Sequence, residues 1–215
     1  MGELRILPVD GIGEIRPGDD LATVVVAAAP WLAEGDIVVL TSKIVSKAEG
    51  CLVRLPSAEP ARQAAWDATL AAQTARPVAS RGRTRIVRTH GGLVLASAGI
   101  DASNVDASTL LVLPVDPDAS ARSIRAAIRK RAGIDVAVII SDTMGRPWRL
   151  GLVDVAIGVA GLRPLVDYRG QRDPYGNELA VTVTAVADEL AAATDLVQGK
   201  LSRIPVAVVR GLVPD

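Results

Sequence analysis

The stretch from residue 136 to 151, VAVIISDTMGRPWRLG, joins an apolar run to side chains that could do chemistry. Five apolar residues, Val136–Ile140, predict a strand buried on both faces. Asp142 and Thr143 follow where that strand would end, and open α/β sheets place ligand chemistry at such ends. Their hard oxygens suit Mg²⁺ or Mn²⁺. Arg146 and Arg149 in the next loop could bind phosphate or carboxylate, although a capping Asp and two solvated arginines would explain the same pattern.

A second polar stretch, TSKIVSKAEG at residues 41–50, follows another predicted buried strand, Ile37–Leu40. The side chains that could line a nucleotide phosphate are Ser42, Lys43, Ser46 and Lys47. Two ammonium groups and two hydroxyls just past a strand favour phosphate binding. A solvated turn with ordinary lysines is the alternative interpretation, because short motifs give many false matches.

A third candidate lies in AGIDASNV, where Asp101, Ser103 and Asn104 share one turn. Asx-turn chemistry explains Asp and Asn at such positions without any ligand. The turn becomes a metal site only if Asp101 meets Asp142 in space, because two carboxylates bind a divalent cation better than one.

Composition excludes several classes of function. The 24 basic and 24 acidic residues cancel, so no overall charge favours nucleic acid or a membrane surface. Aromatic residues are too few, with three Trp, two Tyr and no Phe, for a base-stacking surface. His90 is the sole histidine, which rules out a multi-histidine zinc site. Neither a P-loop nor a GxGxxG fingerprint occurs.

The cellular compartment is predicted from two further features. Cys51 is the sole cysteine, so an intrachain disulfide is impossible and a reducing compartment fits. The N-terminus MGELRILPVDG lacks the basic and apolar regions of a signal peptide. We therefore expect a soluble, cytoplasmic protein.

Strands and helices alternate irregularly, which predicts an α+β architecture of mixed β-sheets with flanking helices in a single domain over residues 1–215. The predicted strands are Leu4–Val9, Ile37–Leu40, Arg85–Thr89, Leu93–Ser97, Val136–Ile140, Leu152–Ala160 and Pro205–Arg210. The predicted helices are Leu21–Leu32, Ser57–Ala75, one starting at Asp116 and Val181–Val197. A polar loop at Asp167–Gly176 is interpreted as a substrate-side or subunit-contact loop.

Eight blocks, taken in order, resemble the coenzyme F(420)-0:γ-glutamyl ligases (the CofE family) across essentially the whole chain. The blocks are GxxEIxPGDDL, GDIVVLTSKIVSKAEG, AGIDASNV, LPVDPDASA, SDTMGRPWRLG, DYRGQRDPYGNEL, VADELAAATDLVQGK and PVAVVRG. Eight ordered blocks are much more specific than any single motif. In some actinobacterial relatives a nitroreductase-like domain follows this ligase domain.

The resemblance implies a GTP-dependent amide ligase that adds L-glutamate to the deazaflavin precursor of coenzyme F(420). The substrate carboxylate would attack the γ-phosphate of GTP, and the amine of glutamate would then displace phosphate from the acyl phosphate. The implied cofactors are GTP as co-substrate with Mn²⁺ or Mg²⁺. Two alternatives remain open: a metal-dependent GTP phosphohydrolase and a non-catalytic nucleotide-binding module.

The resemblance also implies roles for individual residues. Asp101 and Asp142 would be metal ligands, with Thr143 holding a second cation. Arg146 and Arg149 are not implied by the resemblance: their charge and loop position alone make them candidates to act with Asp142 in catalysis, by binding substrate phosphate or carboxylate. The residues expected to contact GTP are Ile12, Gly13, Glu14, Ile15, Ser42, Lys47, Asn104, Gln198 and Lys200.

One position departs from the family pattern. Lys200 stands where some relatives carry a glutamine that helps to bind a second metal, and a charged lysine cannot act as a ligand. The second site is therefore expected to be altered or to hold a monovalent ion such as K⁺. The family's fold implies two intertwined lobes and a homodimer, with small-molecule substrates and neither nucleic acid nor membrane as a partner.

Overall fold

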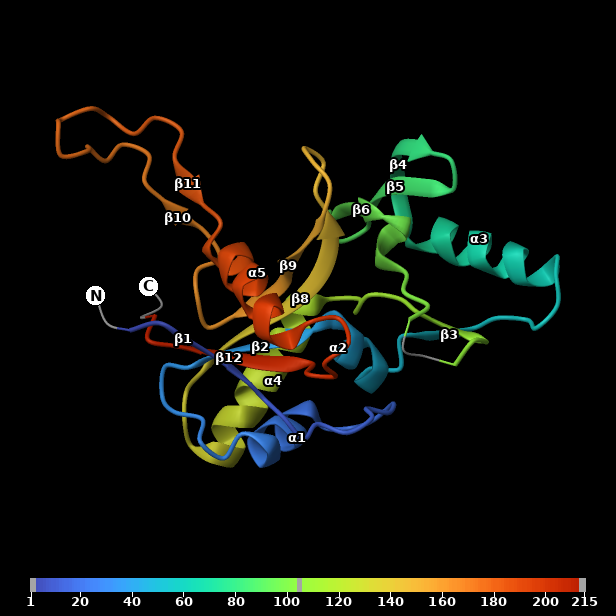
Figure 1. Cartoon of the computed structure of the whole chain (residues 1–215), viewed down its shortest axis with the longest axis horizontal. Helices are drawn as coiled ribbons and strands as arrows, with labels where there is room; N and C mark the ends of the chain where they lie inside the picture. The colour runs from blue at the N-terminus through green and yellow to red at the C-terminus, as the bar shows by residue number, and fades with distance from the viewer. Residues whose placement is uncertain (1–2, 104–105, 213–215) are drawn as a thin grey trace.

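A computed structural model describes residues 3–103 and 106–212. Its largest sheet, the main sheet, is mixed and has five strands (Figure 1). The strands lie in the order β1-β12-β2-β8-β9. Their bounds are Arg5–Pro8 (β1), Val206–Arg210 (β12), Ile37–Thr41 (β2), Ala137–Gly145 (β8) and Leu152–Ala160 (β9). The central strands β2 and β8 are parallel, and the other neighbours are antiparallel. The carboxyl ends of β2 and β8 therefore meet at one end of the sheet.

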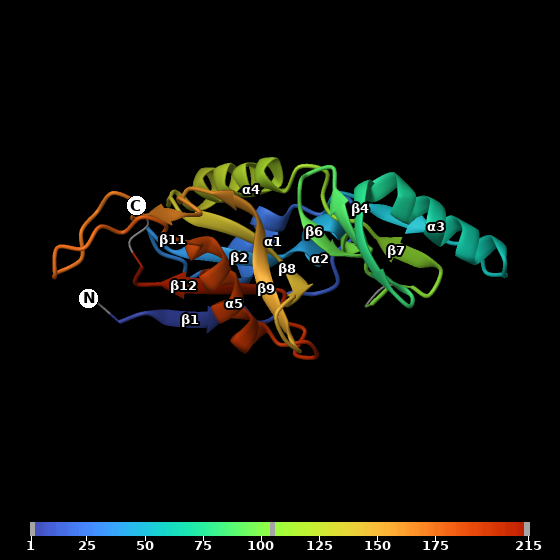
Figure 2. The same cartoon turned by 90° about the horizontal axis from the view of Figure 1, so that it is seen from above.

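Helices cover both faces of this sheet (Figure 2). They are α1 (Leu21–Ala28) and α4 (Pro117–Ala132) on one face and α5 (Val186–Gln198) on the other. Alternate strand residues point to opposite faces, so Val38 and Val138 pack under α1 and α4, while Ile37 and Ile139 pack under α5. Two apolar cores thus hold β2 and β8 from both sides. None of the described helices is long and apolar enough to cross a bilayer.

The start of α4 follows the sequence prediction. The Asp116 side chain accepts a hydrogen bond from the backbone N–H of Ala119 at 2.8 Å, and Pro117 occupies the first helical turn. Gly133 ends the helix in the left-handed conformation, with φ of 72°, which glycine adopts without a Cβ penalty. These two ends fix α4 across the sheet.

The chain between α2 (Ser42–Ala48) and α4 leaves the main sheet and builds a second unit, residues 52–111, which we call the inserted unit (Figure 1). Its elements are β3 (Leu52–Arg54), α3 (Ala61–Gln73), β4 (Thr74–Arg81), β5 (Thr84–Thr89), β6 (Val94–Ala96), the 3₁₀ turn η1 (Ser97–Gly99) and β7 (Thr109–Leu111). The predicted hairpin at residues 90–92 is confirmed, because β5 pairs with β6. The α+β class is likewise confirmed.

A second extension carries the polar loop predicted at residues 167–176. Residues 162–185 form an arm that projects from the main sheet in Figure 1, with β10 (Val166–Asp167) paired to β11 (Val183–Thr184). Tyr175 and Val181 on this arm are almost fully exposed. The arm is held by its own turn contacts, such as the ion pair between Arg169 and Asp167.

Three helices are shorter than predicted. α3 covers Ala61–Gln73 in place of the predicted Ser57–Ala75, because Thr74 and Ala75 belong to β4. α1 ends before the predicted Leu32 because Pro30 lacks a backbone N–H and biases the preceding residue away from helix. α5 begins after the predicted Val181 because Val183 and Thr184 pair with β10 instead. Tertiary pairing overrides the helical pattern there.

Two predictions about the polar stretches are also corrected. The strand predicted to end at Ile140 continues to Gly145, since residues 141–145 pair with β9 after an irregularity between Ile140 and Ser141. Residues 42–48, which had the alternative interpretation of a solvated turn, form helix α2. Asp142 and Thr143 therefore lie on a strand rather than in a loop.

Candidate active site

Two of the predicted site residues meet where β2 and β8 end side by side. β2 and β8 pair from Ile37 opposite Ala137 to Thr41 opposite Ser141. The residues that follow these pairs, Ser42 and Asp142, are therefore neighbours. Ser42 Oγ donates a hydrogen bond to Asp142 Oδ1 at 2.7 Å. Parallel pairing thus brings together two residues that are far apart in the sequence.

Asp142 has an unusual proton affinity for a carboxylate. Its pKa is raised to about 6, chiefly by burial and also by the nearby charges of Asp154 and Asp101, while the Ser42 hydrogen bond acts in the opposite direction. Burial and neighbouring carboxylates disfavour the charged form of Asp142, and a bound cation would stabilise it. This electrostatic arrangement is what a cation-binding position requires.

Asp154 on β9 belongs to this cluster and was not predicted. It pairs with Thr143 across the β8–β9 ladder and is only 4% exposed. Thr143 Oγ1 donates to its Oδ1 at 2.8 Å, and Ser141 Oγ donates to its Oδ2 at 3.1 Å. Burial raises the pKa of Asp154, and the charge of Asp195 adds to this effect. The signal was a lone carboxylate inside the apolar run LVDVAIGVA.

Asp101 approaches the cluster from the inserted unit. Its Oδ2 lies 2.8 Å from Lys43 Nζ, and its Oδ1 accepts the backbone N–H of Ser103 at 2.6 Å. Burial works against the charged form, but the Lys43 and Ser103 hydrogen bonds outweigh it and lower the pKa. Because the charge of Asp101 raises the pKa of Asp142, the two carboxylates are electrostatic neighbours as the sequence argument required. Asn104 lies outside the described residues.

The early loop reaches the site through an ion pair. Lys47 Nζ on α2 lies 2.5 Å from Glu14 Oε1, and the lysine is 8% exposed. In the same loop, Ile15 is buried in the core and Ile12 packs against it, while Gly13 is exposed. The loop is thereby held beside the last turn of α2.

Gln198 at the end of α5 is a buried amide. It is 2% exposed, and neither its amide nitrogen nor its oxygen has a hydrogen-bond partner among the described residues. Such an unpaired amide costs free energy unless something binds to it. Lys200, two residues further along the chain, is exposed. Its positive charge partly offsets the rise in the pKa of Asp154 that burial causes. Of these two residues predicted to contact GTP, Lys200 is therefore near the carboxylate of Asp154.

Arg146 and Arg149 lie in the turn between β8 and β9, beyond the carboxylates. Arg146 Nη2 donates to the carbonyl of Leu150, so this side chain folds back over its own turn. Its Nε is buried without a partner among the described residues. Arg149 is exposed. The structure brings neither guanidinium into a hydrogen bond with the predicted metal ligands.

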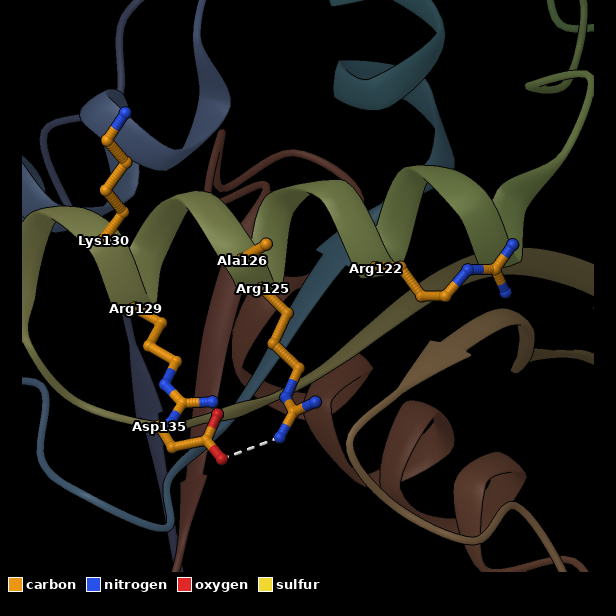
Figure 3. Close-up of a pocket in the computed structure, with 6 residues that line it drawn as sticks. All are labelled: Arg122, Arg125, Ala126, Arg129, Lys130 and Asp135. Carbon is orange, nitrogen blue, oxygen red and sulfur yellow. Dashed lines mark hydrogen bonds and ion pairs between the residues drawn. The ribbon is translucent and has the colours of Figure 1, made fainter.

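A groove of about 490 Å³ lies elsewhere, on the outer side of α4 (Figure 3). It is lined by Arg122, Arg125, Ala126, Arg129, Lys130 and Asp135. Arg125 Nη2 pairs with Asp135 Oδ2 at 2.7 Å, as the dashed line shows. Asp135 precedes the first residue of β8, so this groove is at the opposite end of the strand from Asp142, roughly 20 Å away at about 3.3 Å per residue. It is separate from the carboxylate site.

Known proteins match this chain over nearly its full length. The model of the F(420)-0:gamma-glutamyl ligase family matches residues 11–211. The coenzyme F(420):L-glutamate ligase of Methanopyrus kandleri is 44% identical, over 99% of this chain and 88% of the relative. Those of Methanothermobacter thermautotrophicus and Haloarcula marismortui are 40% and 42% identical, over 97% and 96% of this chain and 89% and 87% of the relatives. The chain therefore belongs to the F(420)-0:gamma-glutamyl ligase family.

Proposed function

We propose that this protein uses GTP to join L-glutamate to the coenzyme F(420)-0 precursor through an acyl phosphate. The family gives the reaction class: the protein is a coenzyme F(420):L-glutamate ligase, an amide ligase of F(420) biosynthesis. The observation that best supports the GTP-dependent mechanism is the carboxylate cluster of Asp101, Asp142 and Asp154 beside two lysines of α2. Phosphoryl transfer needs positioning and charge stabilisation of this kind.

The donor set fits Mg²⁺ or Mn²⁺. The candidate ligands offer only hard oxygen atoms, which these ions prefer. Among residues 3–103 and 106–212, no group of three or more His, Cys, Asp or Glu side chains could hold a metal ion without further ligands. Mg²⁺ usually takes one or two carboxylates and completes its shell with substrate phosphates and water. Asp101 and Asp142 would supply the carboxylates, and Thr143 would hold a second cation. When bound, the cation would neutralise phosphate charge and polarise the γ-phosphoryl group.

We propose that the nucleotide lies over the start of α2. The backbone of Ile12, Gly13, Glu14 and Ile15 would contact GTP, together with Ser42, Lys47, Asn104, Gln198 and Lys200. Two observations support this assignment: Lys47 is only 8% exposed, and the amide of Gln198 has no partner among the described residues. A phosphate would give Lys47 a second partner beside Glu14, and a guanine edge or phosphate would give Gln198 its first. Lys200 replaces a ligand with a cation, which favours K⁺ or no ion at the second metal site.

The proposed chemistry has two displacements. A carboxylate oxygen of the precursor attacks the γ-phosphorus of GTP, and GDP leaves with the bridging oxygen. The amine of glutamate then attacks the acyl carbon and loses a proton, and phosphate leaves as the amide forms. Lys43 and Lys47 would stabilise the negative charge of the phosphates, and Asp142 would help to position the γ-phosphate for attack. Arg146 and Arg149 would bind the precursor's phosphate or carboxylate from the hairpin turn.

We further propose that residues 1–215 act as a single ligase domain within a cytoplasmic homodimer. Exposed apolar side chains on the arm and on the inserted unit support a subunit contact, among them Val78, Val94, Tyr175 and Val181. The arm and the inserted unit would pack against a second copy of the chain and so give the two intertwined lobes expected of this family. The partners would be small molecules, not nucleic acid or a membrane.

An isotope experiment tests the acyl-phosphate mechanism. Precursor labelled with ¹⁸O in its carboxylate is incubated with GTP, L-glutamate and MnCl₂, and the released phosphate is analysed by mass spectrometry. The mechanism predicts one ¹⁸O atom in each phosphate, because the attacking oxygen stays with phosphorus. Unlabelled phosphate with GTP consumed would instead indicate a GTP phosphohydrolase, and unchanged GTP would indicate a nucleotide-binding module.

A further inference from the structure

The turn that joins β8 to β9 exposes an aromatic side chain. Trp148 is 70% exposed, and its neighbour Leu150 is 97% exposed. Exposed large apolar side chains gathered at one tip are unusual unless they bind something. The turn lies on the hairpin whose strands carry Asp142, Thr143 and Asp154.

The turn is built to hold its shape without a ligand. Arg146 spans it, since its backbone N–H donates to the carbonyl of Gly151 at 3.3 Å and its Nη2 donates to the carbonyl of Leu150. Gly151 has φ of 116°, and a Cβ there would lie 2.5 Å from Arg146 Nη2, so glycine is needed for this fold-back. Trp148 and Arg149 are thereby presented outward on a fixed turn.

The distance from this turn to the reaction centre suits a long substrate. Asp142 to Gly145 spans three residues of strand, about 10 Å, and the chain from Asp142 to Trp148 can reach at most roughly 20 Å. In the precursor, the deazaflavin ring and the reacting carboxylate would lie at opposite ends of the molecule. A substrate with its carboxylate near Asp142 would therefore bring its ring near Trp148.

Other aromatic side chains of the chain lie elsewhere. Trp31 packs under the guanidinium of Arg210, 5.7 Å from the ring centroid. Trp66 is on α3 of the inserted unit, and both tyrosines are on the arm. Trp148 is the tryptophan on the hairpin that carries the carboxylates.

We infer that Trp148 is a substrate-specificity residue that stacks on the deazaflavin ring, while Arg149 beside it faces the phosphodiester. This inference rests on the proposed ligase function. Flat aromatic rings stack on tryptophan without needing directional hydrogen bonds, which suits an exposed platform. The ring is thus held at one end of the hairpin while the carboxylate reacts at the other.

Steady-state kinetics of variants test this role. Trp148→Ala should raise the KM for the precursor about tenfold, within the range of one lost stacking contact, and should leave the KM for GTP unchanged. Trp148→Phe keeps a ring and should stay within about threefold of wild type. Val115→Ala, at a 95% exposed position before α4 and outside this turn, is the control and should leave both constants unchanged. Direct titration of the fluorescent precursor should give the same order of affinities.

The outcomes separate this inference from the ligase function. Wild-type protein that forms no glutamylated product would overturn the function itself. Ligation by Trp148→Ala with an unchanged KM for the precursor would overturn only the stacking role. Loss of the dimer in Trp148→Ala, measured by sedimentation, would also overturn it, because the turn would then be a subunit contact.

Discussion

At the scale of single residues, the site is centred on Asp142, where burial and neighbouring carboxylates oppose ionisation and the hydrogen bond from Ser42 favours it. Sequence reasoning predicted Asp142 and Ser42 as site residues because both follow apolar strands, and parallel pairing of β2 and β8 explains why they meet. It missed Asp154 because alternating strands often carry an outward polar residue, and only the fold shows that this carboxylate points inward. Asp101 could be linked to Asp142 only conditionally, since the inserted unit brings it there.

The raised pKa of Asp142 predicts that the free energy of unfolding of the metal-free protein depends on pH. Its pKa is about 6 in the fold against 3.8 ordinarily, so between these pH values the unfolded chain has lost a proton that the folded chain keeps. Stability therefore falls as pH rises from about 4 to about 6, by about 2 kcal/mol after allowance for partial exposure. In EDTA, Asp142→Asn should be more stable than wild type by this amount at pH 7 and equal to it at pH 4. Urea unfolding checks this, and equal stabilities at both pH values would contradict it.

Lys47 should act on nucleotide binding and not on glutamate. Lys47→Ala removes an ammonium group that would bind phosphate with charge-assisted hydrogen bonds, so the KM for GTP should rise about tenfold. The KM for glutamate should stay within about twofold of wild type. Lys130→Ala is the control, because Lys130 lies on α4 in the separate groove (Figure 3). Initial rates at varied GTP measure the effect, and unchanged GTP kinetics would remove Lys47 from the site.

At the scale of elements, strands were predicted better than helix ends and polar continuations. The limits of β9 were predicted fully because its apolar run is bounded by glycines and polar turns. β8 was cut short because its last residues are polar, and their pairing with β9 is a long-range contact that no local pattern reveals. α2 was missed because SKIVSKA is too short for a helical period to stand out. The site depends on both, since α2 and the end of β8 carry its side chains.

Close packing between β9 and α4 gives a stability prediction. A Cβ on Gly158 would lie 2.4 Å from the carbonyl oxygen of Pro117, where backbone cannot easily move. Gly158→Ala should therefore lower the free energy of unfolding by about 1–3 kcal/mol. Gly145→Ala in β8 is the matched control, because a Cβ there meets nothing within 4 Å. Urea midpoints compare the two, and equal loss in both variants would mean that the contact with α4 is not what matters.

At the scale of the whole molecule, two extensions leave the main sheet with little support. α3 buries one side chain among the described residues, Thr69, and the arm exposes Tyr175 and Val181. Sequence reasoning could name the arm's polar loop as a contact but could not foresee how far it would project, because nothing local specifies tertiary packing. These extensions are the surfaces that a second copy would cover.

Sedimentation equilibrium tests the dimer directly. The account predicts a species of twice the 22.3 kDa chain mass at micromolar concentration, because burying the exposed apolar side chains of the arm and inserted unit favours association. Replacing Val181, 85% exposed, with Asp should shift the mass toward one chain without unfolding it. A wild-type mass of one chain at that concentration would contradict the homodimer.

The central claim is that this site drives glutamate ligation with GTP. The most direct measurement is mass spectrometry of the deazaflavin precursor after incubation with purified protein, GTP, L-glutamate and MnCl₂. The account predicts product heavier by one or more glutamyl units, dependent on GTP and nearly abolished in Asp142→Asn. GTP hydrolysis without any gain in precursor mass, or full ligation by Asp142→Asn, would contradict it.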